Sequence, residues 1–203
     1  MSSKKVLMQK VKKDVTSLKS SPLYKYRLEN SYLPVLGAGS YEAEVVFVGE
    51  APGKNEAISG RPFCGRAGEI LDEMLKSINL KREDIYITNI VKDRPPKNRD
   101  PKPKEIDLYA PFLERELDII KPKVVATLGR LAMTYLLEKY GAEENVGKIS
   151  DLHGKVVKIK MSEKEIYLMP LYHPAATIYN QKLKTVLLDD FKKLQKQLKK
   201  LYE

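Results

Sequence analysis

Three polar side chains and one aromatic ring have the types and positions needed to hold a small polar ligand. Glu50, Asn89 and His173 each lie at or just after the end of a short apolar segment, and Phe63 stands in the loop sequence RPFCGRAG. A carboxylate can orient water, an amide offers donors and an acceptor, and a neutral imidazole can donate one N–H to an oxygen that gains charge. With an aromatic ring as a stacking surface, this combination points to a pocket for a flat, polar ring.

Alternating segments of strand and helix character must position these residues. Short apolar runs predict strands, and stripes of apolar residues spaced three or four apart predict helices. We expect strands at 45–48, 85–91, 124–128, 155–160 and 166–169, the last two as a hairpin or as two short strands, and helices over about the first twenty residues and at 65–78, 105–120, 129–140 and 183–201. The alternation predicts an α/β fold whose mostly parallel sheet is covered on both faces. We expect one domain over 1–203, with a helical arm at 1–40 and a C-terminal helix at 182–203.

The carboxyl ends of parallel strands lie along one edge of a sheet, so Glu50, Asn89 and His173 could converge there. An Asn amide suits the imide edge of uracil, which presents a donor at N3 and an acceptor at O4, whereas cytosine carries the opposite pattern. Taken alone, Glu50 could cap its own loop and Asn89 could be a turn residue. His173 could bind a loop carbonyl, and Phe63 could belong to the core. Only the joint placement of the four favours a binding site.

The glycine-rich segment after the first strand does not fit a nucleotide-binding motif. A Walker loop needs four residues between its glycines and Ser or Thr after its Lys. Here three residues separate Gly49 from Gly53, and Asn55 follows Lys54. Pro52 also lacks the backbone N–H that a phosphate cradle uses. We therefore do not expect ATP binding at this loop.

The composition favours a nucleic-acid partner. The net charge of +10 predicts a polyanionic partner, although a Lys-rich surface could instead serve solubility or heat resistance. One cysteine and two histidines leave too few ligands for a metal site, so no metal is expected. No apolar run approaches a membrane span, and the N-terminus lacks the apolar segment of a secretory signal. We expect an intracellular, cytoplasmic protein associated with DNA, and the many Lys and Glu residues are typical of a thermophile.

Five segments in one order carry a resemblance to a known family: GEAPG, GRPFCGRAG, DIYITNIVKDRPPKNRDP, TLG and YHPAA. Over about residues 44–180 the chain resembles the family-four uracil-DNA glycosylases of the uracil-DNA glycosylase superfamily. The resemblance implies a three-layer α/β/α fold with a central parallel four-stranded sheet, and it favours a monomer. It also implies hydrolysis of the N-glycosidic bond of deoxyuridine in DNA, which leaves an abasic site for base excision repair.

The resemblance assigns roles to the site residues. Gly49, Glu50 and Ala51 border the uracil and the attacking water, and Phe63 stacks on the flipped base. Asn89 reads its Watson–Crick edge and His173 stabilises the departing uracil anion, so the catalytic set is Glu50, Asn89 and His173. The best-studied branch of the superfamily has an Asp at the position of Ala51. This chain therefore has no direct equivalent of that base.

Basic and loop residues around the site are expected to contact DNA. The expected phosphate contacts are Arg66, Lys92, Arg94, Lys97 and Arg99, and the segment aligned with the duplex wedge contributes Ala176, Ile178 and Tyr179. The Lys-rich C-terminal helix could add DNA affinity, recruit a sliding clamp or form only a solvated outer face. Two other functions stay open: a module that binds uracil-containing or single-stranded DNA without cutting it, and a glycosylase for another deaminated base.

One feature of the resembled family is missing here. Its members usually carry four cysteines that ligate an iron–sulfur cluster, and the aligned positions are Leu18, Ser21, Asp93 and Tyr109. We therefore expect neither a cluster nor any other cofactor. In its place we expect Asp93 to pair with a basic residue of the N-terminal segment and Tyr109 to pack near Leu18.

Overall fold

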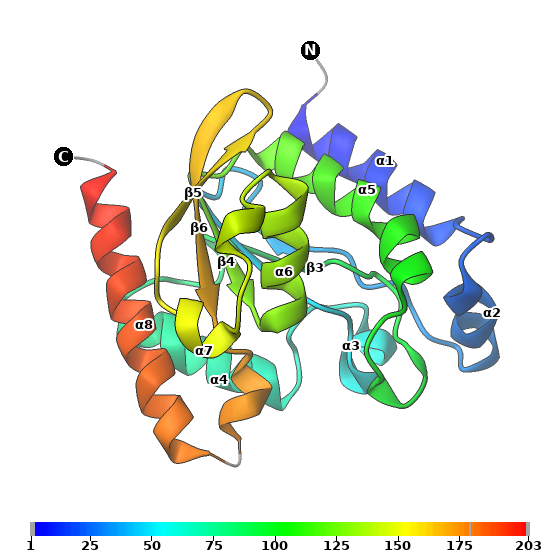
Figure 1. Cartoon of the computed structure of the whole chain (residues 1–203). Coiled ribbons are helices and arrows are strands. Elements are labelled where there is room, and N and C mark those ends of the chain that lie inside the picture. The colour runs from blue at the N-terminus through cyan, green and yellow to red at the C-terminus, as the bar shows by residue number, and fades with distance from the viewer. Residues whose placement is uncertain (1–2, 179, 202–203) are drawn as a thin grey trace.

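A mixed β-sheet forms the centre of the computed structural model, which describes residues 3–178 and 180–201 (Figure 1). Its strands are β1 (Ala38–Gly39), β2 (Val45–Gly49), β3 (Tyr86–Asn89), β4 (Val124–Leu128), β5 (Val157–Met161) and β6 (Lys164–Leu171). Their order across the sheet is β1-β3-β2-β4-β6-β5. The central strands β3, β2, β4 and β6 run parallel, while β1 and β5 pair antiparallel at the two edges. The parallel strands therefore all end at the same edge of the sheet.

Helices cover both faces of this sheet (Figure 1). They are α1 (Lys4–Thr16), α2 (Pro22–Glu29), α3 (Lys54–Ser59), α4 (Arg66–Ser77), α5 (Pro103–Ile120), α6 (Arg130–Lys139), α7 (Ile149–Leu152) and α8 (Gln181–Lys200), with 3-10 turns η1 (Pro96–Asn98), η2 (Glu143–Asn145) and η3 (Pro174–Thr177). Helices α1, α5 and α6 share a core with Val46 and Val48, whereas α4 and α8 share one with Val45 and Phe47. Because successive side chains of a strand point to opposite faces, β2 contributes to both cores. No helix in the described part of the chain is long and apolar enough to cross a membrane.

The three-layer α/β/α fold is confirmed, with one correction to its sheet. The four parallel strands are those that the resemblance implies, but β1 and β5 widen the sheet to six strands within the described residues. Strand β1 has two residues, which is too short to leave a periodic pattern in the sequence. Strands β5 and β6 form the hairpin that was one of two interpretations. Ser162 and Glu163 at its tip both have positive φ, as a tight two-residue hairpin turn requires.

The N-terminal arm is helical, but it is divided differently from the prediction. The first helix ends at Thr16 rather than near residue 20, and α2 follows from Pro22. Val6 is 42% exposed. Met8, Val11 and Val15 are buried instead, because their spacing of three and four residues faces the core that α5 also lines.

Candidate active site

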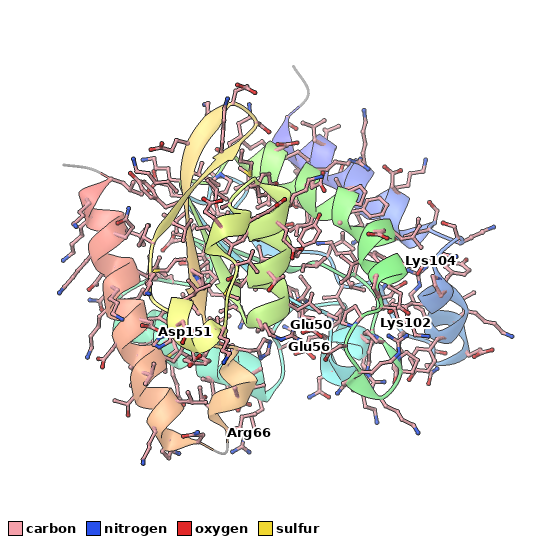
Figure 2. All side chains as sticks on the ribbon, viewed as in Figure 1. Glu50, Glu56, Arg66, Lys102, Lys104 and Asp151 are labelled. Carbon is pink, nitrogen blue, oxygen red and sulfur yellow. The ribbon has the colours of Figure 1, made fainter. Side chains whose placement is uncertain are left out.

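A cavity of about 490 Å³ lies where the parallel strands end. Glu50, Phe63, Asn89 and His173, the four residues that the sequence singled out, all line it. The rest of its wall consists of Ala51, Pro52, Gly53, Glu56, Ala67, Pro95, Asn98, Arg99, Asp100 and Ala175. Figure 2 shows Glu50 and Glu56 close together beside α3. Side chains that are far apart in the sequence therefore meet at one site.

The ends of β2 and β3 place Glu50 and Asn89 next to each other. Gly49 pairs with Asn89, and the N–H of Ile90 donates to the Gly49 carbonyl at 3.0 Å. Any side chain at Gly49 would overlap both the Oδ1 of Asn89 and the ring of Phe63. The amide and the ring thus approach the same small space, and glycine is needed to leave it open.

Phe63 is held in a strained turn before any ligand arrives. Its φ of 48° lies in the left-handed region that bulky residues rarely adopt. The Nη2 of Arg82 donates to the carbonyls of Pro62 and Phe63 at 2.9 and 2.6 Å, while its Nη1 binds Asp72 at 2.8 Å. Gly68 of α4 packs so closely that a Cβ there would overlap the Phe63 carbonyl. These contacts fix the direction in which the ring points.

Glu56 of α3 supports the other side of the same turn. Its Oε1 accepts hydrogen bonds from the backbone N–H groups of Cys64 and Gly65 at 3.0 and 2.9 Å. Gly65 is the N-cap of α4 and has no side chain to fill that role. The carboxylate of Glu56 therefore supplies the acceptor and the negative charge that a helix N-terminus favours. It joins α3, the Phe63 turn and α4 into one wall of the cavity.

His173 is a neutral hydrogen-bond donor at neutral pH. The N–H of Ala175 donates to its Nδ1 at 3.1 Å, so Nδ1 is an acceptor and the proton of the neutral ring lies on Nε2. Burial lowers the pKa of His173 from 6.5 to about 4, against a smaller opposing effect of the Glu56 charge. The ring centroid lies 5.8 Å from that of Phe63, with 32° between the planes. The cavity thus has an N–H donor beside its aromatic shelf.

Two further carboxyl groups, those of Glu50 and Asp100, also line the cavity. Burial raises the pKa of Glu50 above its ordinary value of 4.5, the charge of Asp100 adds to this rise, and Arg130 opposes it. Arg130 forms an ion pair with Asp100 at 3.6 Å. A half-buried carboxylate in such a place can orient a water molecule or stabilise a sugar that gains positive charge.

Lys92 is a correction to the expected phosphate contacts. Its side chain is 0% exposed, and its Nζ lies 2.6 Å from the Oε2 of Glu116. A lysine in this position cannot reach a phosphate on the surface of DNA. The prediction was wrong because Lys92 opens a basic, Pro-rich run, and it was assigned to the exposed loop rather than to the turn that packs behind β3.

The other basic residues fall into two groups. Arg66 and Lys97 are exposed, and Figure 2 shows Arg66 at the outer end of α4. Arg94 and Arg99 are half-buried and already engaged. Arg94 binds tyrosine hydroxyls of the N-terminal arm, and Arg99 pairs with Glu105 at 2.6 Å. Of these four side chains, Arg66 and Lys97 are therefore better placed to bind a phosphate.

The segment after His173 forms the short turn η3. Ala176 is exposed on this turn, as a residue that contacts DNA must be. Ile178 is half-buried and packs against the core that α4 and α8 share, so its side chain is not free to enter a duplex without moving. Tyr179, the remaining wedge candidate, lies outside the described residues.

The positions aligned with the cluster cysteines form a buried polar network instead. The Nη1 of Arg27 lies 3.1 Å from both carboxylate oxygens of Asp93. The Tyr109 hydroxyl donates to Asp93 at 2.5 Å and is also hydrogen-bonded to the Oγ of Ser21 at 2.9 Å. Leu18 offers no ligand atom and packs against the core that contains Tyr109. These residues do not fit an iron–sulfur cluster, and the expected pairing of Asp93 with a basic residue of the arm is confirmed.

Three residues that shape the site were not predicted from the sequence. Glu56 and Arg82 act through backbone groups of the Phe63 turn, and such contacts leave no motif in the sequence. Asp100 lies in a run of basic residues and prolines that was assigned to DNA binding, so its acidic side chain was overlooked. The sequence signal for Glu56 is its place six residues after Glu50, at the start of α3. Among the described residues, no group of three or more His, Cys, Asp or Glu side chains could hold a metal ion.

The chain belongs to the uracil-DNA glycosylase superfamily. The family model described as "Uracil DNA glycosylase superfamily" matches residues 36–201. A Type-4 uracil-DNA glycosylase of Sulfurisphaera tokodaii is 46% identical over 93% of this chain and 83% of that protein. Proteins of the same name from Archaeoglobus fulgidus and Thermotoga maritima are 42% and 35% identical, over 90% and 98% of this chain and 88% and 99% of theirs. The composition typical of a thermophile fits such relatives.

Proposed function

We propose that this chain is a uracil-DNA glycosylase, which hydrolyses the N-glycosidic bond of deoxyuridine in DNA and leaves an abasic site for base excision repair. The observation that carries the proposal is the cavity in which the Asn89 amide, the Phe63 ring and the neutral His173 donor meet. Relatives that carry the name Type-4 uracil-DNA glycosylase over most of the chain support the same activity.

Recognition uses the shelf and the amide together. A uracil that is turned out of the helix loses its stacking, and contact with the Phe63 ring offsets part of that loss. Asn89 then accepts from N3–H and donates to O4 of the flipped base. Cytosine presents the reverse pattern at these atoms, so acceptor faces acceptor and donor faces donor, and both hydrogen bonds become repulsions. Gly49 leaves the room for this edge-on contact.

Cleavage breaks the bond between the sugar C1′ and the uracil N1, and its electron pair leaves with uracil. The Nε2–H of His173 donates to the uracil oxygen that gains negative charge. The carboxylate of Glu50 stabilises the sugar cation or orients the water whose oxygen joins C1′. In the overall balance the water supplies hydroxide to the sugar and a proton to uracil.

DNA binding begins with the phosphate backbone. Arg66 and Lys97 are exposed and adjoin the cavity-lining Ala67 and Asn98 in the chain. Their charges provide sequence-independent attraction that weakens as salt rises. Ala176, exposed on η3 next to the cavity-lining Ala175, is the candidate for contact with DNA beside the flipped nucleotide. A sliding clamp as a partner, a monomeric state and a cytoplasmic location stay predictions.

The test is incubation of the protein with uracil-containing single- and double-stranded oligonucleotides, followed by alkali to reveal abasic sites. Excision of uracil but not of cytosine is the expected result. Asn89→Asp should reduce uracil excision, and Leu136→Ala, a core change on α6, serves as the control for general destabilisation. Retention of DNA without any strand break after alkali would favour a binding module. Excision of hypoxanthine in preference to uracil would favour the glycosylase for another deaminated base.

A further inference from the structure

The ammonium group of Lys92 lies directly behind the residue that reads the base. The side chain is fully buried, and its Nζ donates to the Asn89 carbonyl and the Thr88 hydroxyl, both at 2.7 Å, and to Glu116 at 2.6 Å. These contacts use the three donors of the ammonium group. Lys92 is therefore a fixed part of the turn that follows β3.

Glu116 of α5 extends this contact into a closed network. Its carboxylate also accepts from the hydroxyls of Thr88 at 2.8 Å and Tyr86 at 3.2 Å, and from the N–H of Gly37 at 3.3 Å. Burial and the Glu116 charge raise the pKa of Tyr86, so its hydroxyl stays a donor. The network ties α5 and the segment before β1 to the last residues of β3.

The network and the base-reading amide lie on opposite faces of β3. Tyr86 belongs to the core that α5 lines, Ile87 belongs to the other core, and the alternation continues through Thr88 to Asn89. The backbone around the turn is held at two more points. The N–H of Val91 donates to the Glu50 carbonyl at 3.0 Å, and the N–H of Val35 donates to the Lys92 carbonyl at 2.7 Å. Only the ammonium of Lys92 holds the carbonyl of Asn89 itself among these contacts.

A buried ion pair of this kind adds little net stability compared with apolar side chains of the same size, because both charges lose their hydration. Burial accordingly lowers the pKa of Lys92, which Glu116 only partly opposes. The pair instead fixes the orientation of the Asn89 peptide, because the ammonium group of Lys92 binds the Asn89 carbonyl.

We propose that Lys92 is a positioning residue, which sets the orientation of the Asn89 amide through the Asn89 carbonyl. This inference rests on the proposed glycosylase activity. It makes the specificity of the pocket depend on a charge that never touches the substrate.

The test compares three proteins: the wild type, Lys92→Met and the double variant Lys92→Met with Glu116→Gln. Lys92→Met leaves Glu116 buried without its counter-charge, so its urea midpoint should fall. The double variant removes both charges and should recover most of that midpoint. Leu136→Ala is the control for stability alone, because it opens a cavity in the core beside α6 and the Leu136 side chain forms none of the hydrogen bonds of this network.

Kinetics on a uracil oligonucleotide then separate positioning from stability. If Lys92 positions Asn89, the double variant keeps a kcat about 10²-fold below the wild type despite its recovered midpoint, because small misplacements of a reading group have effects of this size. KM for DNA should change less than about 3-fold, since ground-state DNA contacts are untouched. A double variant whose kcat recovers together with its stability would overturn the proposal, as would a Leu136→Ala protein with the same loss of kcat.

A readout that needs no activity keeps this test apart from that of the proposed function. The side-chain NH₂ resonances of Asn89, assigned by their loss in Asn89→Ala, should form one sharp pair in the wild type. In the double variant they should broaden or double as the amide samples other orientations. An unchanged, sharp pair overturns the inference even if the wild type cuts DNA. A wild type that excises no uracil overturns the proposed function, while the resonances still decide the role of Lys92.

Discussion

Replacement of His173 by Gln should remove a large part of the pH dependence of stability. Burial lowers the pKa of His173 to about 4 in the folded protein, whereas its ordinary value of 6.5 applies to the unfolded chain. The unfolded chain therefore binds more protons between these two values. The stability from neutral His173 is fully present above pH 6.5 and is lost as pH falls to about 4. Between these limits the loss amounts to about 3 kcal/mol.

The assay is urea unfolding of the wild type and of His173→Gln at a series of pH values. Unfolding is monitored by far-UV circular dichroism, because the chain has no Trp for fluorescence. The difference between the two unfolding free energies isolates this side chain, since other titrating groups contribute equally to both. That difference should shrink by about 3 kcal/mol in favour of the variant as pH falls from neutral to about 4.

If the difference between the two unfolding free energies stays constant over this pH range, the reasoning is refuted. Such a result would mean that folding does not lower the pKa of His173. A long-range ¹H–¹⁵N spectrum gives an independent check, with the proton expected on Nε2 at neutral pH. Uracil excision by a second variant, His173→Leu, should fall by about 10²-fold, the usual effect of losing one donor to a developing anion.

Three further changes test other parts of the site. Asp93→Asn leaves Arg27 buried without its counter-charge and should lower the unfolding free energy by about 3–5 kcal/mol in urea titrations, so an unchanged midpoint would show that the pair is not buried. Arg82→Met frees the Phe63 turn and should lower the single-turnover rate constant for excision about 10-fold, with little change in DNA affinity. A loss confined to DNA affinity would contradict the role of Arg82. Arg66→Gln should reduce the slope of log affinity against log salt by about 1 on uracil-free DNA, and an equal slope would remove Arg66 from the phosphate contacts.

The strand ends could be predicted from the sequence because the apolar runs that form the strands are short and sharply bounded. The strand at 124–128 and the helix at 105–120 were predicted almost to the residue, since Gly129 follows the strand and Lys121 follows the helix where each apolar pattern stops. Parallel strands then bring their carboxyl ends to one edge by topology alone. This is why Glu50, Asn89 and His173 could be grouped without coordinates.

The remaining features depend on contacts that composition does not encode. Lys92 follows a predicted strand and Arg66 stands at the start of a predicted helix, yet the first of these basic residues is fully buried and the second is exposed. The difference arises from Glu116, which lies 24 residues further along the chain and turns toward β3. Similarly, the tautomer of His173 depends on the backbone N–H of Ala175, which only the geometry of η3 brings within reach.

The loop between β3 and α5 supplies part of the cavity wall, and three buried or half-buried ion pairs hold it. At the start of the loop, Lys92 pairs with Glu116 and Asp93 pairs with Arg27. Near its end, Arg99 pairs with Glu105. Its prolines restrict the backbone further and reduce the entropy that the loop loses on folding. In the resembled family, cysteines at the positions aligned with Asp93 and Tyr109 ligate an iron–sulfur cluster. Here the same wall depends on charge and packing. Its geometry should therefore respond to mutation of the paired charges and not to iron chelation or oxidation.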